Sequence, residues 1–407
     1  MHMKKKSFSL VTLTFVILLF VISNSAIAKQ KVVNFLSLGD YTGPIGAIVV
    51  PADEAIRDYF RYINEQGGID GIKLNFIGMD TRYDVARALS SYKRFRKTKR
   101  LLLVSTYGTA IDKAILPLVA KDKLFALSAG SGEFVAKPGR AVLYGPSYQD
   151  AFCAALDWMV NDWKQKGNFD MPKVGYMGWG NAYGHEHLRG GKEYASHIGV
   201  DLLKPEFFSP GTMDHSTYLT RLKKANYIYV TGIDPTPTNV IRDAYRLGMT
   251  KNIQFMTGYY APMEKVGLEV HNKELQGVVA TSFHLRGNEM QSHPLTNKIW
   301  GMYHKEPISE MNGIYGQGLV FAKIFIEGLK IALKDVGYDK LDGTAMYRAY
   351  QQLTGRDISE GIQGLISYSP TERRGSREIR FYRVKGDTQV PISGWIKTPD
   401  ALKYHQF

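Results

Sequence analysis

The chain has 407 residues, a formal net charge of +14 and a single cysteine, Cys153. A chain of this length has room for two domains, each with an ample core. A single cysteine excludes an internal disulfide, so side-chain packing must stabilise the fold. The positive charge favours anionic solutes or an anionic membrane surface as partners. Nucleic acid is not expected as a partner, because the basic residues are not interleaved with aromatic ones.

The N-terminus has the pattern of an export signal. Lys4 to Lys6 precede an apolar run, Leu10 to Ile22, and a small-x-small site follows at Ala26 to Ala28. This order predicts a signal peptide over residues 1–28, cut after Ala28. The apolar run is short for a membrane span, and no later stretch approaches the roughly 18 apolar residues that a span needs. No cysteine lies at the cleavage site, which argues against a lipid anchor. We therefore expect a free, monomeric protein in the periplasm of a Gram-negative cell.

Strands and helices alternate through the first part of the mature chain. The predicted strands are 31–38, 74–79, 101–104 and 124–127, and the predicted helices are 52–63, 84–97 and one from Ala110 onward. Short connections between alternating elements predict an α/β fold whose parallel sheet is covered on both faces.

The alternation restarts after Tyr144-Gly145-Pro146, without obvious sequence repetition. This series has predicted helices at 149–164, 218–224 and 238–247, a further helix that extends to His197, and strands at 173–177, 202–208, 227–230, 253–256 and 278–283. The last part has predicted helices at 293–303, 315–333 and 343–353, strands at 364–368 and 377–384, and a charged hairpin turn at 371–377. A second lobe of the same architecture is therefore expected.

Candidate binding residues follow the strands, because ligands bind parallel sheets at the carboxyl ends of the strands. Loops 41–46, 107–109 and 128–132 are rich in Gly, Ser, Thr and Tyr and poor in charge. The turn Ser105 to Thr109 precedes a helix start, where free N–H groups and the positive helix end favour an anion. Thr109 adds a hydroxyl that can donate to a carboxylate. An ordinary strand-to-helix turn is the alternative interpretation.

Several motifs resemble one known family. Residues 40–44 (DYTGP), 63–71 (INEQGGIDG), Asp80 after a strand, and 181–184 (NAYG) are similar to branched-chain amino acid ABC-transporter substrate-binding proteins. The INxxGGIxG stretch is the most specific of these, and the resemblance covers essentially the mature chain.

The resemblance implies a type I periplasmic binding protein: two Rossmann-like lobes with parallel sheets, joined by three hinge crossings, with solute held in the cleft between them. It also implies an inner-membrane ABC permease as partner and no enzymatic activity. The implied crossings lie near 144–147, 281–285 and 361–367, with lobe 1 formed by 29–145 and 282–362 and lobe 2 by 146–281 and 363–407.

The resemblance also implies a ligand site. A hydroxyl after the third strand and a small loop after the fourth bind a ligand carboxylate in amino-acid-binding relatives, and a tyrosine of the second lobe closes over the ligand. The candidate ligand-binding residues here are Tyr107, Gly108, Thr109, Ser128, Ala129, Gly130, Ser131, Tyr183, Asp234, Tyr259 and Tyr260.

One departure leaves the ligand class open. Tyr259 and Tyr260 stand where relatives carry the acid that pairs with an ammonium group, and Asp234 is the acid placed to substitute. The ligand is then an amino acid, an aromatic or aliphatic carboxylate, or a small amide. No cofactor or metal is expected, since His185 and His187 would point about 200° apart on a helix. A sensory receptor of the same fold and an exported α/β enzyme are the alternative functions.

Overall fold

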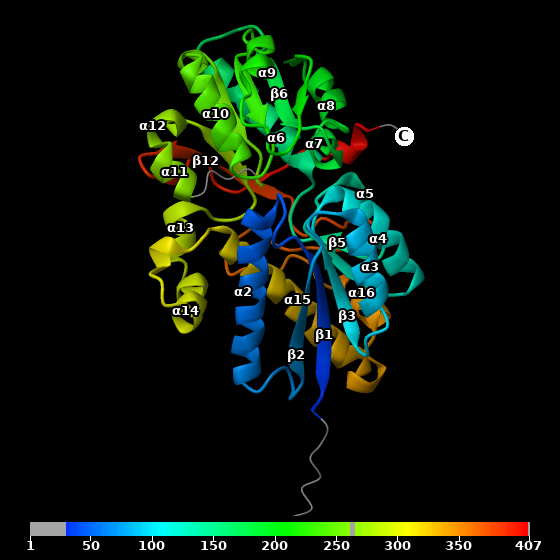
Figure 1. Cartoon of the computed structure of the whole chain (residues 1–407). Helices are drawn as coiled ribbons and strands as arrows, with labels where there is room; N and C mark the ends of the chain where they lie inside the picture. The colour runs from blue at the N-terminus through cyan, green and yellow to red at the C-terminus, as the bar shows by residue number, and fades with distance from the viewer. Residues whose placement is uncertain (1–29, 261–264, 406–407) are drawn as a thin grey trace, which may run out of the picture.

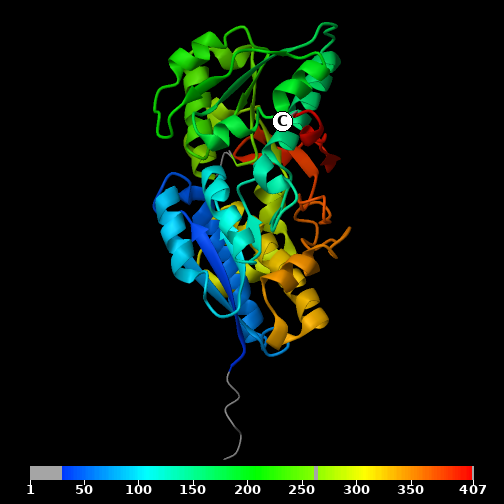
Figure 2. The same cartoon turned by 90° about the vertical axis from the view of Figure 1, so that its right-hand side faces the viewer.

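The computed structural model describes residues 30–260 and 265–405, so the predicted signal peptide lies outside the described residues. Two lobes lie one above the other, each built on its own sheet (Figures 1 and 2). Within the described ranges, no helix has the length and apolar character needed to cross a membrane.

The first lobe contains a five-stranded parallel sheet in the order β2-β1-β3-β4-β5. Its strands are β1 (Val32–Gly39), β2 (Lys73–Asp80), β3 (Leu101–Thr106), β4 (Ala126–Ser128) and β5 (Ala141–Leu143). All six residues of β3 are buried, as expected for a strand covered on both faces. The expected parallel sheet is confirmed.

Helices cover both faces of this sheet, because successive side chains of a strand point to opposite sides. Phe35 packs on Phe60 of α2 (Gly46–Glu65) and on Phe325 of α15 (Ile314–Val336), with ring centroids 5.6 and 5.4 Å away. Leu36 belongs to the core cluster on the other face, under α3 (Val85–Phe95) and α4 (Thr109–Lys121).

The second lobe contains a nine-stranded sheet in the order β13-β12-β11-β10-β9-β6-β7, with β8 on β6 and β14 on β12. Its strands are β6 (Lys173–Trp179), β7 (Asp201–Leu202), β8 (Glu206–Phe208), β9 (Tyr227–Val230), β10 (Gln254–Thr257), β11 (Val279–Ser282), β12 (Glu378–Lys385), β13 (Thr388–Pro391) and β14 (Ile396–Lys397). Strands β12 to β14 pair antiparallel, unlike the rest. The reason is that β11 leaves toward the first lobe and the chain returns from that lobe into β12.

The remaining helices complete the two lobes. They are α5 (Glu133–Ala136), α6 (Tyr148–Gln165), α7 (Ala182–Glu186), α8 (Gly191–His197), α9 (Ser216–Arg221), α10 (Thr236–Arg246), α11 (Lys265–Val270), α12 (Asn272–Leu275), α13 (Gly287–Ser292), α14 (Pro294–Tyr303) and α16 (Gly343–Tyr350). Side chains cap several of their N-termini: Ser147 accepts from the N–H of Asp150, and Asn181 from that of Gly184.

Some predicted elements differ from the observed ones. The helix expected to reach His197 is split into α7 and α8, and Gly190 before α8 is left-handed (φ 73°). The strand expected at 202–208 is two short strands around Pro205, which lacks an N–H for a sheet ladder. Segment 364–368 forms only the isolated bridge of Ile366 with Arg356, instead of a strand.

The chain turns back on itself near the predicted charged hairpin at 371–377, since the N–H groups of Ser369 and Ser367 donate to the carbonyls of Glu372 and Gly375 (3.0 and 2.7 Å), and the segment is also part of the junction between the lobes. Arg374 is 4% exposed and its guanidinium lies 3.0 Å from Asp150 and 2.9 Å from Asp400. The Leu143 N–H donates to the Arg373 carbonyl (2.8 Å), which binds the end of β5 to this segment. The Leu285 N–H donates to the Ile362 carbonyl (2.8 Å). The three segments that cross between the lobes are therefore hydrogen-bonded to one another and lie side by side.

Candidate ligand site

A small cavity lies between the lobes, at the carboxyl ends of the parallel strands. Its lining residues are Ile45, Ile48, Tyr83, Tyr107, Gly108 and Ala129 from the first lobe, and Tyr148, Trp179, Tyr183, Ile233 and Tyr260 from the second. Its volume is about 20 Å³, room for about one water molecule. The lobes are thus closed, and a solute the size of an amino acid needs them to move apart. None of the described lining residues carries a charged side chain.

Tyr107 is fixed by a buried acid of α2. Its hydroxyl donates to Asp53 Oδ1 (2.7 Å), and the hydroxyls of Ser37 and Tyr41 donate to Oδ2 at 2.6 and 2.8 Å. Burial raises the pKa of Asp53, while these three donors oppose the rise. The arrangement holds the Tyr107 ring at the floor of the cavity.

Gly108 allows α4 to begin against an aromatic ring. Its φ is 108°, a conformation that residues with a side chain rarely adopt. A Cβ at this position would also lie 2.5 Å from the ring of Tyr83. Only glycine therefore brings the start of α4 this close to the cavity wall.

The second-lobe wall is a cluster of tyrosines. Tyr148 packs against Tyr183 edge-to-face and against Tyr259 in a stack, with ring centroids 5.0 and 5.7 Å apart. The hydroxyls of Tyr260 and Tyr144 lie 2.7 Å apart, and the Tyr259 hydroxyl donates to the Pro146 carbonyl (3.1 Å). Tyr144 and Pro146 belong to the first crossing, so this wall is tied to the hinge.

The structure places the predicted site residues in two groups. Tyr107, Gly108, Ala129, Tyr183 and Tyr260 line the cavity. The others lie behind it or beside it: Thr109, Ser128, Gly130, Ser131, Asp234 and Tyr259.

Three of the residues outside the cavity wall bear on ligand recognition. The Thr109 hydroxyl is buried and makes no hydrogen bond to other described residues, whereas the buried Ser131 hydroxyl lies beside the hydroxyls of Tyr259 and Tyr260 and lowers the pKa of both. Asp234 Oδ1 accepts from the hydroxyl of Thr238 (3.4 Å) in the loop before α10. Asp234 therefore faces its own helix and is not among the residues that line the cavity.

Asp112 takes up the Ser128 hydroxyl, one of the groups expected to bind the ligand carboxylate, and sequence reasoning missed it. Its Oδ1 accepts from the Ser128 hydroxyl (2.9 Å), which accepts in turn from the Gly130 N–H (2.9 Å). A Cβ on Gly130 would lie 1.9 Å from Asp112 Oδ2, so the carboxyl fills the space against that glycine. An acid in the first turn of a predicted helix was the available signal, because helix N-termini favour negative charge.

The charge of Asp112 bears on what can bind above it. Its pKa is raised to about 7: burial is the largest cause, hydrogen bonding to the hydroxyls of Thr106 and Ser128 lowers the pKa, and the neighbouring Glu186 raises it. Two like charges about 4 Å apart repel by about 4 kcal/mol at an effective dielectric constant of about 20. A charge-assisted hydrogen bond contributes about 1.5–3 kcal/mol. An ionised Asp112 therefore opposes a ligand carboxylate at this position.

Polar contacts join the lobes at the side of the cavity. Glu186 of α7 accepts from the N–H of Glu133 at the start of α5 (2.8 Å), and its Oε2 lies 3.5 Å from the Lys113 ammonium of α4. His405 Nδ1 near the C-terminus lies 2.9 Å from Glu133 Oε2. These contacts hold the closed arrangement.

The lining residues outside the predicted set are all aliphatic or aromatic: Ile45, Ile48, Tyr83, Tyr148, Trp179 and Ile233. Ile45 lies in loop 41–46 and Ile233 precedes Asp234, so both were close to predicted positions. Their residue types gave no signal, since apolar residues are more often found in the core.

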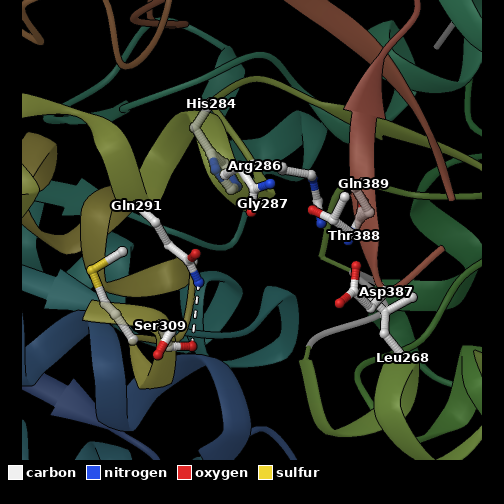
Figure 3. A pocket seen from close by; sticks show the side chains of 12 residues that line it. Leu268, His284, Arg286, Gly287, Gln291, Ser309, Asp387, Thr388 and Gln389 are labelled. Atoms are coloured by element: carbon white, nitrogen blue, oxygen red, sulfur yellow. Dashed lines mark hydrogen bonds between the residues drawn. The ribbon is translucent and has the colours of Figure 1, made fainter. Parts of the chain in front are cut away.

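A second, larger cavity of about 240 Å³ lies beside the second crossing (Figure 3). Gln291 and Ser309 lie on one side of it, and Asp387 and Gln389, from the turn and strand after β12, on the other. His284 is buried there and its Nδ1–H donates to the Leu285 carbonyl (2.7 Å). Burial, with the neighbouring Arg286, holds the pKa of His284 well below its usual value. None of the predicted site residues lines this cavity.

Comparisons with known proteins agree with this architecture. The family model described as periplasmic binding protein matches residues 33–389. No match was found among curated protein sequences.

Solved structures share the fold at low identity. A branched-chain amino acid ABC transporter protein from Thermus thermophilus with bound valine is 18% identical, covers 92% of this chain and 99% of its own, and has a TM-score of 0.82. A fatty acid ABC transporter substrate-binding protein from Thermomonospora curvata is 17% identical, with 92% and 95% coverage and a TM-score of 0.79. The leucine-binding protein LivK from Thermotoga maritima is 18% identical, with 90% and 99% coverage and a TM-score of 0.71. The chain belongs to the periplasmic binding protein family and has its type I fold.

Proposed function

We propose that this chain is the solute-binding component of an ABC importer. In this role it is exported to the periplasm through residues 1–28, captures a small molecule between its lobes and delivers it to an inner-membrane permease. The family match supports the proposal, as do the solved neighbours, which are named as transporter proteins. Their printed ligands, valine and fatty acid, differ from each other, so the fold alone does not name the solute.

The aromatic cavity is the observation that carries the proposal. Both lobes contribute to its wall, and the wall is tied to the crossings through Tyr144 and Pro146. Closing two lobes around a ligand by hinge motion is a known mechanism of solute capture. Because each lobe supplies contacts, a bound solute stabilises the closed form and the permease can distinguish loaded from empty protein.

The ligand class predicted from the sequence was a carboxylate, either an amino acid or a related organic acid. Thr109 and Ser131 remain the hydroxyls nearest the predicted carboxylate position, at the start of α4 and in the loop after β4. The carboxylate stays a prediction, and the position of Asp112 favours a different polar group.

Ligand binding is tested first with the purified mature protein. Amino acids, aromatic acids, aliphatic acids and amides are screened by thermal shift, and each hit is measured by calorimetry. A ligand at 100 times its Kd stabilises the folded state by about 2.7 kcal/mol, so a true ligand raises the melting temperature. Tyr183→Ala should then weaken binding, since Tyr183 lines the cavity.

The matched control is Tyr218→Ala, which removes a tyrosine of α9 that packs on Phe208 and does not line the cavity. Equal affinity of the Tyr183→Ala variant and the wild type would remove this cavity as the binding site. Deleting the gene separates the importer from a sensory receptor: an importer mutant loses uptake of the radiolabelled ligand, whereas a sensor mutant retains it.

A further inference from the structure

We propose that the cavity selects an uncharged, largely apolar ligand whose polar end donates a hydrogen bond, as a primary carboxamide does, and that Asp112 determines this selectivity. The inference rests on the proposed function and names the ligand class for the same site.

The cavity walls favour an uncharged ligand. The described residues that line it are aliphatic, aromatic or small, and none has a charged side chain. The hydroxyl of Tyr107 is already used by Asp53, and that of Tyr260 is paired with Tyr144. A charged group that contacts these lining residues alone would lose its hydration without gaining an opposite charge from them, which is strongly unfavourable. Asp112 is not one of the lining residues.

The polar groups around Asp112, next to the cavity wall, disfavour a carboxylate in particular. The Ser128 hydroxyl, which was expected to donate to the ligand, donates to Asp112 instead. A Cβ built on Gly130 would lie 1.9 Å from Asp112 Oδ2 and 3.1 Å from the backbone carbon of Gly108, so the Asp112 carboxyl lies next to Gly130, while Gly108 lines the cavity. At pH values above the Asp112 pKa of about 7, an external carboxylate would therefore meet an anion of the chain where amino-acid-binding relatives are expected to offer donors.

The remaining polar groups suit a neutral group that both donates and accepts. Asp112 Oδ2 and the Thr109 hydroxyl are buried and make no hydrogen bond to other described residues, and the Ser131 hydroxyl lies beside those of Tyr259 and Tyr260. The carboxyl is an acceptor, or a donor when protonated, and each hydroxyl can be either. A carboxamide offers two N–H donors and one carbonyl acceptor, which matches this set.

Other charges around Asp112 do not reverse this preference. The negative charge of Glu186 in α7 raises the pKa of Asp112, and the positive charge of Lys113 lowers it. The Lys113 and Arg189 side chains lie against Glu186, at 3.5 and 3.4 Å, and are 40% and 47% exposed. These cations therefore lie at the outer edge and compensate Glu186 rather than the cavity floor.

The test uses matched probes that differ only in the polar end. Isovalerate, isovaleramide and isoamylamine form one set, and benzoate, benzamide and benzylamine another. Each is titrated into the purified mature protein by calorimetry at pH 8, with valine and leucine alongside. The expected result is that an amide binds at least tenfold more tightly than its acid and its amine. Acids or amino acids that bind as tightly as the amides would overturn the inference.

Asp112→Asn provides the second measurement. Removing the negative charge should raise the affinity for the acid relative to the amide by at least tenfold, whereas Asp122→Asn, on the far end of α4, should leave the ratio unchanged. An unchanged ratio in Asp112→Asn also overturns the inference. If Asp112→Asn does not fold, the acid-to-amide ratio of the wild type still decides.

Failure of the inference and of the proposed function are distinguishable. A carboxylate whose binding is lost in Tyr183→Ala contradicts the ligand class and leaves the solute-binding function standing. If no probe or screened solute binds, or if binding is insensitive to Tyr183→Ala, both fail together.

Discussion

The carboxyl group of Asp112 shows how burial changes the chemistry of a single side chain. Its pKa is 3.8 in an exposed reference state and is raised to about 7 by burial in the fold. Between these values the unfolded chain releases a proton that the folded chain keeps. The contribution of Asp112 to stability is therefore fully present below pH 3.8 and falls as the pH rises to about 7.

Asp112→Asn should remove this dependence. The stability of the variant relative to wild type should rise by about 1.4 kcal/mol per pH unit between pH 3.8 and about 7 and stay level on either side. The difference is measured by urea unfolding of both proteins at several pH values across this range. Parallel profiles would show that Asp112 titrates alike in the folded and unfolded states.

Asp122→Asn is the control with the opposite sign. Burial acts to raise the pKa of Asp122, but the hydrogen bonds from Tyr92 and Arg96 outweigh it and the pKa is lowered. Its ionised form stabilises the fold above the unfolded pKa, so this variant should lose stability relative to wild type as the pH rises through the acid range.

Residue types predicted part of the site and missed another part. Tyr107, Gly108 and Ala129 were predicted from the loops that follow strands, and they line the cavity. Asp112 was missed because its side chain turns back from α4 onto the neighbouring loop, which only the packing of α4 against β4 brings within reach. Ile48 and Tyr148 were missed because an apolar residue in a helix gives the same pattern whether it faces a core or a ligand.

At the scale of elements, α7 and α5 form the clearest contact between the lobes. Glu186 at the end of α7 accepts from the first N–H group of α5 and lies beside Lys113 of α4. A helix N-terminus has unpaired N–H groups and a positive partial charge, so a carboxylate from the other lobe is well placed there. The contact exists only when the lobes are closed.

Glu186→Ala should therefore shift the protein toward an open form. A hydrogen bond to a charged group contributes about 1.5–3 kcal/mol, which corresponds to a shift of tenfold or more in the ratio of closed to open protein. Small-angle X-ray scattering of the ligand-free protein should show a larger radius of gyration for the variant. Glu193→Ala, on the exposed side of α8, is the matched control. Identical scattering of the Glu186→Ala variant and wild type would mean that this contact does not hold the lobes together.

At the scale of the whole molecule, a buried ion network joins two of the three crossings. Arg374 contacts Asp150 in the first turn of α6, Glu372 in its own segment and Asp400 near the C-terminus, at 3.0, 2.7 and 2.9 Å. Asp150 is fully buried and also accepts from the Ala401 N–H (2.9 Å). The network connects the third crossing to the helix that follows the first.

Arg374→Met should destabilise the fold strongly, because it leaves Asp150 buried without its cation. Removing one partner of a buried ion pair costs about 3–5 kcal/mol, measured as a lower free energy of unfolding in urea. Arg82→Met, which breaks a 3.7 Å pair with Asp80 at a side chain that is 57% exposed, should cost no more than about 1 kcal/mol. Similar losses in the two variants would contradict the role of the network.

The sequence by itself determined the order of strands and helices, the α/β class and the loops that lie near the cavity. These features follow from local periodicity and turn chemistry, which a stretch of ten to twenty residues carries. Only the tertiary structure decided that β12 runs against β11, that 371–377 is part of the junction, and that the Ser128 hydroxyl donates to Asp112. Each of these depends on residues far apart in the chain meeting across a sheet edge or between lobes. No local pattern of residues encodes such a meeting, because long-range packing sets it.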